Sequence, residues 1–374
     1  MKGGYMKYKV PFIKPSFPDA VLVAEDYNTI IENNWFTNFG PFEQRFRREA
    51  ADYIGEGAHA CTVANATLGL DIAVRTLLKE SGQNEVLVPS FTFAAGPEVI
   101  ISNGLTPVFI DIDSNIQPDF EQAAEYISRN RSNMAGILLC NTFGTGNRNI
   151  ESWEGLAQEY GLPLIIDSAA GFGSEYLNDE KIGLRGDCEV FSFHATKPFA
   201  VGEGGMITSR NESFIQKCRE MQNFGFGTNR QIDHIGTNAK MQEINSAIGL
   251  RQLGGFATRL AGRRESLECY KENLSDIDFT FQDNDNRSTV AFVSAIAPSP
   301  EWADLAYTKL HQHGIEARRY YSPLHLESNL ARRSLIAFSL ANTEDIASRT
   351  LSLPLHDHMN VEDIKYIGQV IREV

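Results

Sequence analysis

From residue 58 to residue 208, short apolar runs alternate with longer amphipathic segments. Uninterrupted apolar runs are typical of strands that are buried on both faces, and the amphipathic segments are typical of helices that cover those faces. The alternation therefore predicts an α/β domain built on a mostly parallel, seven-stranded sheet. The expected strands are His59–Val63, Glu85–Val88, Pro107–Asp111, Gly136–Cys140, Leu164–Asp167, Glu189–Phe193 and Met206–Ser209.

Helical periodicity predicts the other elements. The expected helices are Asp19–Asn33, Phe42–Ile54, Thr67–Ser81, Phe120–Asn130, Glu151–Tyr160 and a long one over Lys240–Asn273. Beyond them the pattern changes to a strand over Thr289–Ile296 and helices over Glu301–His313 and Val361–Glu373. We therefore expect residues 1–259 to form an N-terminal segment and a large domain, and residues 260–374 to form a smaller α+β domain.

Composition excludes several classes of protein. The 374 residues carry a formal net charge of −14, and an acidic chain repels a nucleic-acid backbone. The chain has no apolar stretch of about 18 residues, and its basic start lacks the apolar core of a signal peptide, so we expect no membrane span. Five widely spaced cysteines without a Cys-x-x-Cys pair are typical of buried thiols in a reducing compartment. We expect a cytoplasmic protein.

Signatures of several common sites are missing. The chain contains neither Gly-x-Gly-x-x-Gly after a strand nor a P-loop, which argues against dinucleotide and P-loop sites. His356-Asp-His358 and His311-Gln-His313 each place two imidazoles two residues apart, but no carboxylate or cysteine cluster accompanies them. Because a protein metal site needs three or four ligands, no metal is predicted, and these histidines are expected at the surface or against substrate.

An aspartate and a lysine stand at the ends of two expected strands. Asp167 closes an apolar strand and so emerges at the carboxyl edge of the sheet, where open α/β sheets bind ligands. Lys197 comes shortly after the strand Glu189–Phe193, which contains Ser192. The turn Gly202-Glu-Gly-Gly205 comes after Lys197. An ammonium group is costly to desolvate, so a lysine among apolar residues needs a functional reason to lie there.

Pyridoxal 5′-phosphate (PLP) is a cofactor whose chemistry needs both groups. It binds covalently to a lysine amine, and a buried carboxylate keeps its pyridine nitrogen protonated. Desolvation lowers the lysine pKa from about 10.4, which frees the amine to attack and to move protons. Asn65-Ala-Thr67, between a strand and its helix, offers donors for the phosphate, and Phe93 in Pro89-Ser-Phe-Thr-Phe93 offers an aromatic face for the ring.

Each of these features alone has a simpler explanation. A strand-terminal aspartate often only forms a turn, a single lysine is usually solvated, and Phe93 alone would be a core residue. Ser192 alone would be a strand-end hydroxyl. Their combination, in this order along one sheet edge, predicts PLP.

With these residues in place, the chain resembles the DegT/DnrJ/EryC1/StrS family of sugar aminotransferases, which are PLP enzymes of the aspartate aminotransferase fold (fold type I). The resemblance covers most of the chain, and its Ser-Phe-His-x-Thr-Lys segment is highly specific for the family. The matching segments are Trp35-Phe-Thr-Asn-Phe-Gly-Pro41, Asn65-Ala-Thr-Leu-Gly-Leu70, Pro89-Ser-Phe-Thr-Phe-Ala-Ala95, Asp167-Ser-Ala-Ala170, Ser192-Phe-His-Ala-Thr-Lys197, Gly202-Glu-Gly-Gly205, Gly236–Gly249 and Tyr320-Tyr-Ser-Pro-Leu-His325.

The resemblance implies a role for each matched position. Lys197 would be the covalent attachment point of PLP, and Asp167 the partner of its pyridinium nitrogen. The cofactor-binding residues implied besides these two are Ala66, Thr67 and Ser192 for the phosphate, Phe93 for the ring, and Asn238, with Lys240 as the alternative to Asn238.

The resemblance also implies partners and a substrate side. The family forms homodimers with shared active sites, so the loop Gly236–Met241 would act in the second subunit. The substrate-binding residues implied are Thr37, Asn38, Tyr321 and His325. Where the family often has Gln or His against the 3′-oxygen of the cofactor, this chain has Ala170, and His194 is the candidate replacement.

Four basic residues are candidate counter-charges for the diphosphate of a nucleotide-linked substrate, in a chain that is acidic as a whole. Arg230, Arg318, Arg319 and Lys240 are available for this purpose. Arg318-Arg319 fits equally well a solvated pair at a strand end.

The implied reaction moves an amino group from an amino acid, with L-glutamate as the expected donor, to a nucleotide-linked keto-deoxysugar. The resemblance favours C4 of dTDP-4-keto-6-deoxyglucose. The alternatives are a 3-keto-sugar aminotransferase of the same family, a PLP-dependent ketosugar dehydratase, and a non-catalytic binding member. Lys197 argues against the last two, because the dehydratases carry histidine in its place and a binding module has no use for a desolvated amine.

Overall fold

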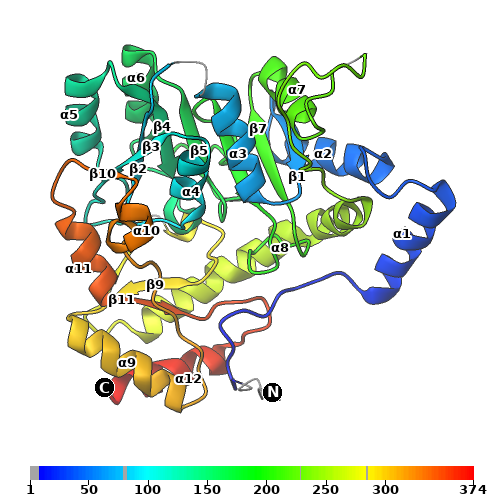
Figure 1. Cartoon of the computed structure of the whole chain (residues 1–374). Coiled ribbons are helices and arrows are strands. Elements are labelled where there is room, and N and C mark those ends of the chain that lie inside the picture. The colour runs from blue at the N-terminus through cyan, green and yellow to red at the C-terminus, as the bar shows by residue number, and fades with distance from the viewer. Residues whose placement is uncertain (1–7, 79–81, 228, 284) are drawn as a thin grey trace, which may run out of the picture.

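A computed structural model describes residues 8–78, 82–227, 229–283 and 285–374. Its centre is an eight-stranded sheet of order β1-β7-β6-β5-β4-β2-β3-β10 (Figure 1). Strands β6, β5, β4, β2, β3 and β10 pair in parallel, and β7 runs antiparallel to both β6 and β1. The bounds are β1 (His59–Val63), β2 (Glu85–Pro89), β3 (Thr106–Ile110), β4 (Met134–Cys140), β5 (Leu164–Asp167), β6 (Cys188–Ser192), β7 (Gly205–Ser209) and β10 (Leu335–Ile336).

The predicted mostly parallel α/β sheet is confirmed, with one strand more than expected. The extra strand, β10, pairs Leu335 and Ile336 with Val108 and Phe109 of β3. Both β10 residues are exposed, so no buried apolar run marks this strand in the sequence. The seven expected strands all occur, with boundaries displaced by a few residues at most.

Helices cover both faces of the sheet. The helices are α2 (Pro41–Ile54), α3 (Ala66–Leu77), α4 (Ala95–Ser102), α5 (Phe120–Asn130), α6 (Ile150–Tyr160) and α7 (Glu212–Met221). Residues of α2, α5 and α6 form one core cluster with the strands, and residues of α3, α4 and α7 form another. Ile165 and Ile166, successive residues of β5, belong to opposite clusters, which explains why these strands are apolar throughout.

Three of these helices, α3, α4 and α7, differ from the predictions. Helices α4 and α7 were not expected from the sequence. The expected helix Thr67–Ser81 corresponds to α3, and its last part, residues 79–81, lies outside the described residues.

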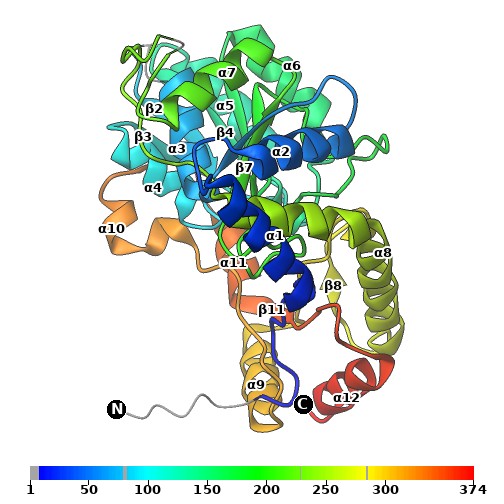
Figure 2. The same ribbon diagram turned by 90° about the vertical axis from the view of Figure 1, so that its right-hand side faces the viewer.

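The C-terminal part contains a second, three-stranded sheet of order β11-β9-β8. Figure 2 shows this part below the large sheet, with α9 and α12 at its lower end. Its elements are β8 (Thr280–Phe281), β9 (Val293–Ile296), α9 (Pro300–Gln312), α10 (Ser328–Ala331), α11 (Ala341–Arg349), β11 (Thr350–Leu353) and α12 (Val361–Arg372). Helix α1 (Ala20–Asn33) lies near the start of the chain. Within the described ranges, no helix combines the length and apolar character that a bilayer crossing requires.

The two parts are joined by α8 (Glu243–Asn273). Phe256 of this helix packs in the core of the large sheet, and Leu267 and Tyr270 pack in the core of the small one. The expected domain boundary between residues 259 and 260 falls inside this continuous helix and stays a prediction. The start of the chain also reaches the small part, since the Val10 N–H donates to the Gly314 carbonyl at 3.1 Å.

Candidate active site

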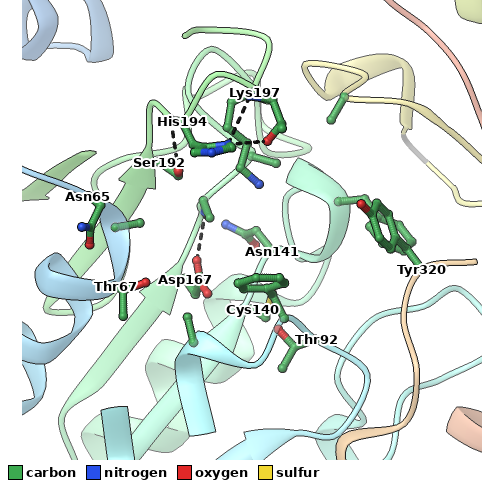
Figure 3. Close-up of a pocket in the computed structure, with 18 of the residues that line it drawn as sticks. Asn65, Thr67, Thr92, Cys140, Asn141, Asp167, Ser192, His194, Lys197 and Tyr320 are labelled. Carbon is green, nitrogen blue, oxygen red and sulfur yellow. Dashed lines mark hydrogen bonds between the residues drawn. The ribbon is translucent and has the colours of Figure 1, made fainter. Parts of the chain in front are cut away.

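A cavity of about 800 Å³ opens at the carboxyl edge of the large sheet (Figure 3). Cys140 and Asp167, paired across the ends of β4 and β5, line it together with Ser192 at the end of β6. The start of α3 forms another wall, and the N-terminal segment and the C-terminal part complete it. A cavity of this size holds a cofactor together with part of a substrate.

Lys197 and Asp167 both line this cavity. Burial lowers the pKa of Lys197, although the nearby Asp167 carboxylate opposes the change. Burial likewise raises the pKa of Asp167, opposed first by the Ala169 N–H and then by the Lys197 ammonium. The low dielectric of the site therefore favours the neutral form of the Lys197 amine. It also means that a cation next to the Asp167 carboxylate would stabilise its charge.

The hydrogen bonds of Asp167 leave part of its carboxylate available. The side chain is 4% exposed, and its Oδ1 accepts from the Ala169 N–H at 3.0 Å. Within the described ranges its Oδ2 has no hydrogen bond, although buried carboxylates normally have several donors. The free oxygen is suited to hold a ligand N–H in the cavity.

The N-terminus of α3 offers an anion site. Asn65 caps the helix by accepting from the Leu68 N–H at 2.9 Å, which leaves the N–H groups of Ala66 and Thr67 without an acceptor within the helix. Gly205 permits the close approach of β7, because a Cβ there would lie 2.8 Å from the Ala66 nitrogen. Thr67 and Ser192 add hydroxyl groups that line the same cavity.

These groups fit PLP. Asp167 would hold the pyridine nitrogen, Lys197 would bind the aldehyde carbon, and the start of α3 would hold the phosphate. The free oxygen of Asp167 is the observation that supports this fit most directly. Phe93 lines the cavity and is 62% exposed, so its ring is available to cover the cofactor from the open side.

Four of the expected site residues do not line the cavity of their own chain. Thr37 and Asn38 lie in the loop between α1 and α2, and Asn238 accepts from the Lys240 Nζ at 2.7 Å. His325 is the fourth residue outside the cavity lining, and its substrate role stays a prediction. Its imidazole is buried between the Ser90 hydroxyl, 2.7 Å from Nδ1, and the Glu344 carboxylate, 3.1 Å from Nε2.

Two expected substrate residues, His194 and Tyr321, do line the cavity. His194 Nδ1 accepts from the Thr196 N–H at 3.2 Å, which fixes the ring at the rim of the cavity. Ala170 also lines the cavity, and its carbonyl accepts from the Thr289 hydroxyl at 2.5 Å.

The arginine candidates lie elsewhere. Arg318 donates to Glu316 at 2.9 Å, and Arg319 donates to Asp304 at 2.6 Å. Neither residue lines the cavity, and each is paired with a carboxylate of the chain. The expected diphosphate role is therefore not supported for this pair.

An aromatic wall was missed by the sequence reasoning. Phe12, Phe292 and Tyr320 line the cavity together with Phe143, and the Phe143 and Phe292 ring centroids lie 4.9 Å apart. The Phe12 and Phe292 centroids lie 5.5 Å apart. These rings come from segments far apart in the sequence, which carry no shared local signal.

Asn141 was also missed, and a signal for it existed. It directly follows the strand that ends at Cys140 and lines the cavity, as Asp167 does at the end of the next strand in the sheet. The rule that located Asp167 at the carboxyl edge of the sheet applies equally to Asn141.

A second buried carboxyl, Glu189 of β6, was missed as well. It is fully buried and accepts from the Ser168 hydroxyl at 2.5 Å, the Tyr176 hydroxyl at 3.2 Å, and the N–H groups of Gly183 and Arg185 at 2.7 and 3.0 Å. Burial raises its pKa to about 7, and these donors oppose the change.

Comparison with known proteins bears on the identity of the chain. Residues 21–372 match the DegT/DnrJ/EryC1/StrS aminotransferase family. Protein Rv3402c of Mycobacterium tuberculosis is 45% identical, over 99% of this chain and 91% of that protein. The dTDP-4-amino-4,6-dideoxy-D-glucose transaminase of Shigella dysenteriae is 30% identical, over 96% of this chain and 98% of its own.

Solved structures agree with the fold. A Bacillus cereus protein, named provisionally as a PLP-dependent aminotransferase, superposes with a TM-score of 0.91 at 32% identity, covering 97% of this chain and 99% of that one. DesI in the presence of its TDP-sugar product gives a TM-score of 0.88 at 29% identity, covering 99% and 94%. The chain belongs to the DegT/DnrJ/EryC1/StrS aminotransferase family and is a PLP-dependent aminotransferase.

Proposed function

We propose that this aminotransferase moves the amino group of L-glutamate to C4 of dTDP-4-keto-6-deoxyglucose. The observation that carries the proposal is the pair of Lys197 and Asp167 in one cavity at the sheet edge. The names of the Shigella relative and of DesI with its TDP-sugar product support a nucleotide-linked sugar as the acceptor. Amination of a 3-keto sugar is the second candidate.

The residues of this chain would divide the work as follows. When bound, PLP supplies an electron sink for the bond changes at the donor and acceptor carbons. Asp167 would keep the proton on the pyridine nitrogen, because its buried carboxylate is stabilised by a cation there. Lys197 Nζ would take a proton from the donor carbon and return one to the acceptor carbon. The N–H groups of Ala66 and Thr67, with Ser192, would fix the phosphate.

We also propose that a second copy of the chain completes the site. Apolar side chains are exposed at Phe93, which lines the cavity and is 62% exposed, and at Ile232 and Ile235, 65% and 82% exposed, in the loop that leads to Asn238. Clustered exposed apolar residues typically mark protein interfaces. Asn238 lies beside this exposed segment and outside the cavity of its own chain, so we expect it to reach the phosphate site of the second copy.

An amination assay tests the reaction. The PLP-loaded enzyme is incubated with nitrogen-15-labelled L-glutamate and a panel of dTDP-, UDP- and GDP-linked 3-keto and 4-keto 6-deoxysugars. We expect the label at C4 of the dTDP-linked sugar, located by NMR. Label at C3 would support the second candidate. Loss of water without labelling would indicate a dehydratase, and no reaction with any sugar would overturn the proposal.

Mixing two inactive variants tests the shared site. Lys197→Ala removes the amine of one copy, and Asn238→Asp places a repelling charge near the phosphate of the other. In a random mixture, half of the dimers are hybrids with one intact site of two, so about a quarter of the wild-type activity should return. If the mixture stays inactive, or if the enzyme is monomeric, the shared site is wrong.

A further inference from the structure

A second, narrower crevice adjoins the PLP cavity. It lies between the N-terminal segment, the turn that carries Lys197, and the chain that follows β11. Five residues line both spaces, namely Phe12, Ile13, Thr196, Lys197 and Ala291. None of the steps assigned above uses this crevice.

His356 lines the crevice and presents an unused hydrogen-bond donor. The side chain is 8% exposed, and its Nδ1 accepts from the His358 N–H at 3.3 Å. A neutral imidazole that accepts at Nδ1 carries its proton on Nε2. In the described part of the chain, this Nε2 has no hydrogen-bond partner. A buried donor without an acceptor costs about 1–3 kcal/mol, so the site is suited to a ligand that supplies one.

The charges around His356 favour an anionic acceptor. The pKa of His356 is lowered to about 4, mainly by burial and then by the charges of His358, Arg263 and Lys14, against Asp363. The ring is therefore neutral at neutral pH while its surroundings are positive. Asp357, the nearest acid along the chain, already accepts from Arg263 at 2.6 Å. An anionic oxygen at Nε2 would gain both the hydrogen bond and the attraction of these cations.

The shape of the crevice limits what it admits. Its free volume is about 20 Å³, enough for one oxygen-sized group. A metal ion is not favoured, because among the described residues no group of three His, Cys, Asp or Glu side chains is placed to hold one. His356 Nδ1 is in addition already used by the backbone N–H of His358.

We propose that this crevice receives one oxygen of a carboxylate of the amino-acid donor, with His356 Nε2–H as its hydrogen-bond donor. The inference rests on the proposed function, because an amino-acid donor is the substrate that brings a carboxylate next to Lys197. His356 thereby becomes a binding residue for the donor, from one of the two histidine pairs that were expected at the surface or against substrate. Holding the carboxylate beside Lys197 would orient the donor for proton transfer.

Direct binding to the PLP-loaded enzyme tests the proposal. The probe is glutarate, a dicarboxylate without an amine, titrated by calorimetry and compared with its neutral diamide. We expect His356→Phe to weaken glutarate binding at least about tenfold, because a hydrogen bond to a charged acceptor is lost. His356→Gln keeps an N–H donor and should stay within about threefold of wild type. Binding of the diamide should be equal in all variants.

The matched control is His358→Phe, in the same segment. Its imidazole is exposed and contacts the Ser16 hydroxyl at 3.2 Å, and the N–H that His356 accepts from belongs to the backbone. The interaction of this exposed ring with His356 is weak, so we expect glutarate binding to stay within about twofold of wild type. Melting temperature and the absorbance of bound PLP show whether each variant is folded and loaded.

Several outcomes would overturn the inference. These are equal glutarate affinity in wild type and His356→Phe, an equal loss in His358→Phe, or no glutarate binding to wild type at millimolar concentration. The binding assay is separate from the amination assay. If labelled glutamate aminates a sugar while His356→Phe binds glutarate normally, only the crevice is wrong; if glutarate binding depends on His356 but no sugar is aminated, only the proposed acceptor is wrong.

Discussion

Asp167 and Glu189 are buried carboxyls on adjacent strands, but they differ in how many hydrogen bonds they accept. In the register of β5 and β6, Asp167 is paired with Val190 and Glu189 with Ile166, so the two side chains lie on opposite faces of the sheet. Asp167 faces the cavity with a single hydrogen bond from the described residues, whereas Glu189 accepts from two hydroxyls, two backbone N–H groups and, at 3.5 Å, the Asn141 amide.

The difference in hydrogen bonding indicates that Asp167 is available to bind a ligand, whereas Glu189 stabilises the fold. Glu189 fastens the segment between β5 and β6, since Ser168, Tyr176, Gly183 and Arg185 all lie there or at its ends. Asp167 has a spare acceptor beside a lysine whose pKa is lowered by burial. Incomplete hydrogen bonding of a buried charge next to a cavity is therefore a more informative sign of function than burial alone.

The largest effect on turnover is expected from removing the Lys197 amine from the cavity. Lys197→Ala should lower turnover by about 10³-fold or more, because the group that moves the proton is lost. The variant should still bind added PLP, and its melting temperature should not fall, because the Glu189 network is untouched. Steady-state amination assays and thermal melts check this, and turnover by the variant within about tenfold of wild type would refute the role of Lys197.

A smaller loss is expected from neutralising the cavity carboxyl. Asp167→Asn should lower turnover by about 10²-fold, because an amide does not stabilise a protonated pyridine nitrogen. Its stability should be unchanged or higher, since a buried charge with one hydrogen bond is replaced by a neutral group. Absorbance of bound PLP as a function of pH would report the changed protonation. A large loss of stability in this variant would remove the contrast with Glu189.

For Glu189, on the other face of the sheet, we expect substitutions to lower stability more than activity. Glu189→Leu should lower the free energy of unfolding by about 3 kcal/mol, because the donors around it lose their acceptor. Glu189→Gln, which keeps an acceptor, should cost about 1 kcal/mol. Urea denaturation measures both values. Activity per folded molecule should fall less in these variants than in Asp167→Asn, and the reverse order would show that Glu189 belongs to the chemistry.

The smallest expected effect is a pH dependence. The pKa of Glu189 is raised to about 7 in the folded state, so the folded protein holds this proton where the unfolded chain has released it. This contribution is complete below the unfolded pKa and is lost as the pH rises through 7. Between pH 6 and pH 8, wild type should lose about 1 kcal/mol more stability than Glu189→Gln. Parallel curves for the two proteins would contradict the raised pKa.

Local pattern was sufficient for the frame of the site. Apolar runs located the seven expected strands. The ends of these runs marked the carboxyl edge of the sheet, and Asp167 and Lys197 both line the cavity at this edge. The strand–Asn65–helix junction likewise indicated the anion site at α3. These features depend on a few neighbouring residues, so they can be read along the chain.

The features that the sequence did not show depend on partners distant in sequence. His325 was expected at the substrate; in the structure its imidazole contacts Ser90 and Glu344, and it does not line the cavity. Strand β10 has no apolar run of its own and exists through pairing with β3. Glu189 was not expected, because its donors come from turns and from Asn141, and the sequence does not show that these segments approach it.

The sequence by itself determined the sheet, its carboxyl edge and the lysine and aspartate on that edge, because periodicity and strand ends are local properties. Only the tertiary structure decided which buried group is satisfied and which is left free. Asp167 keeps an unused oxygen and His356 an unused N–H because no donor or acceptor from a distant segment reaches them within the described chain. Hydrogen-bond satisfaction is a property of the packed whole, and for that reason the two groups became visible only in the folded chain.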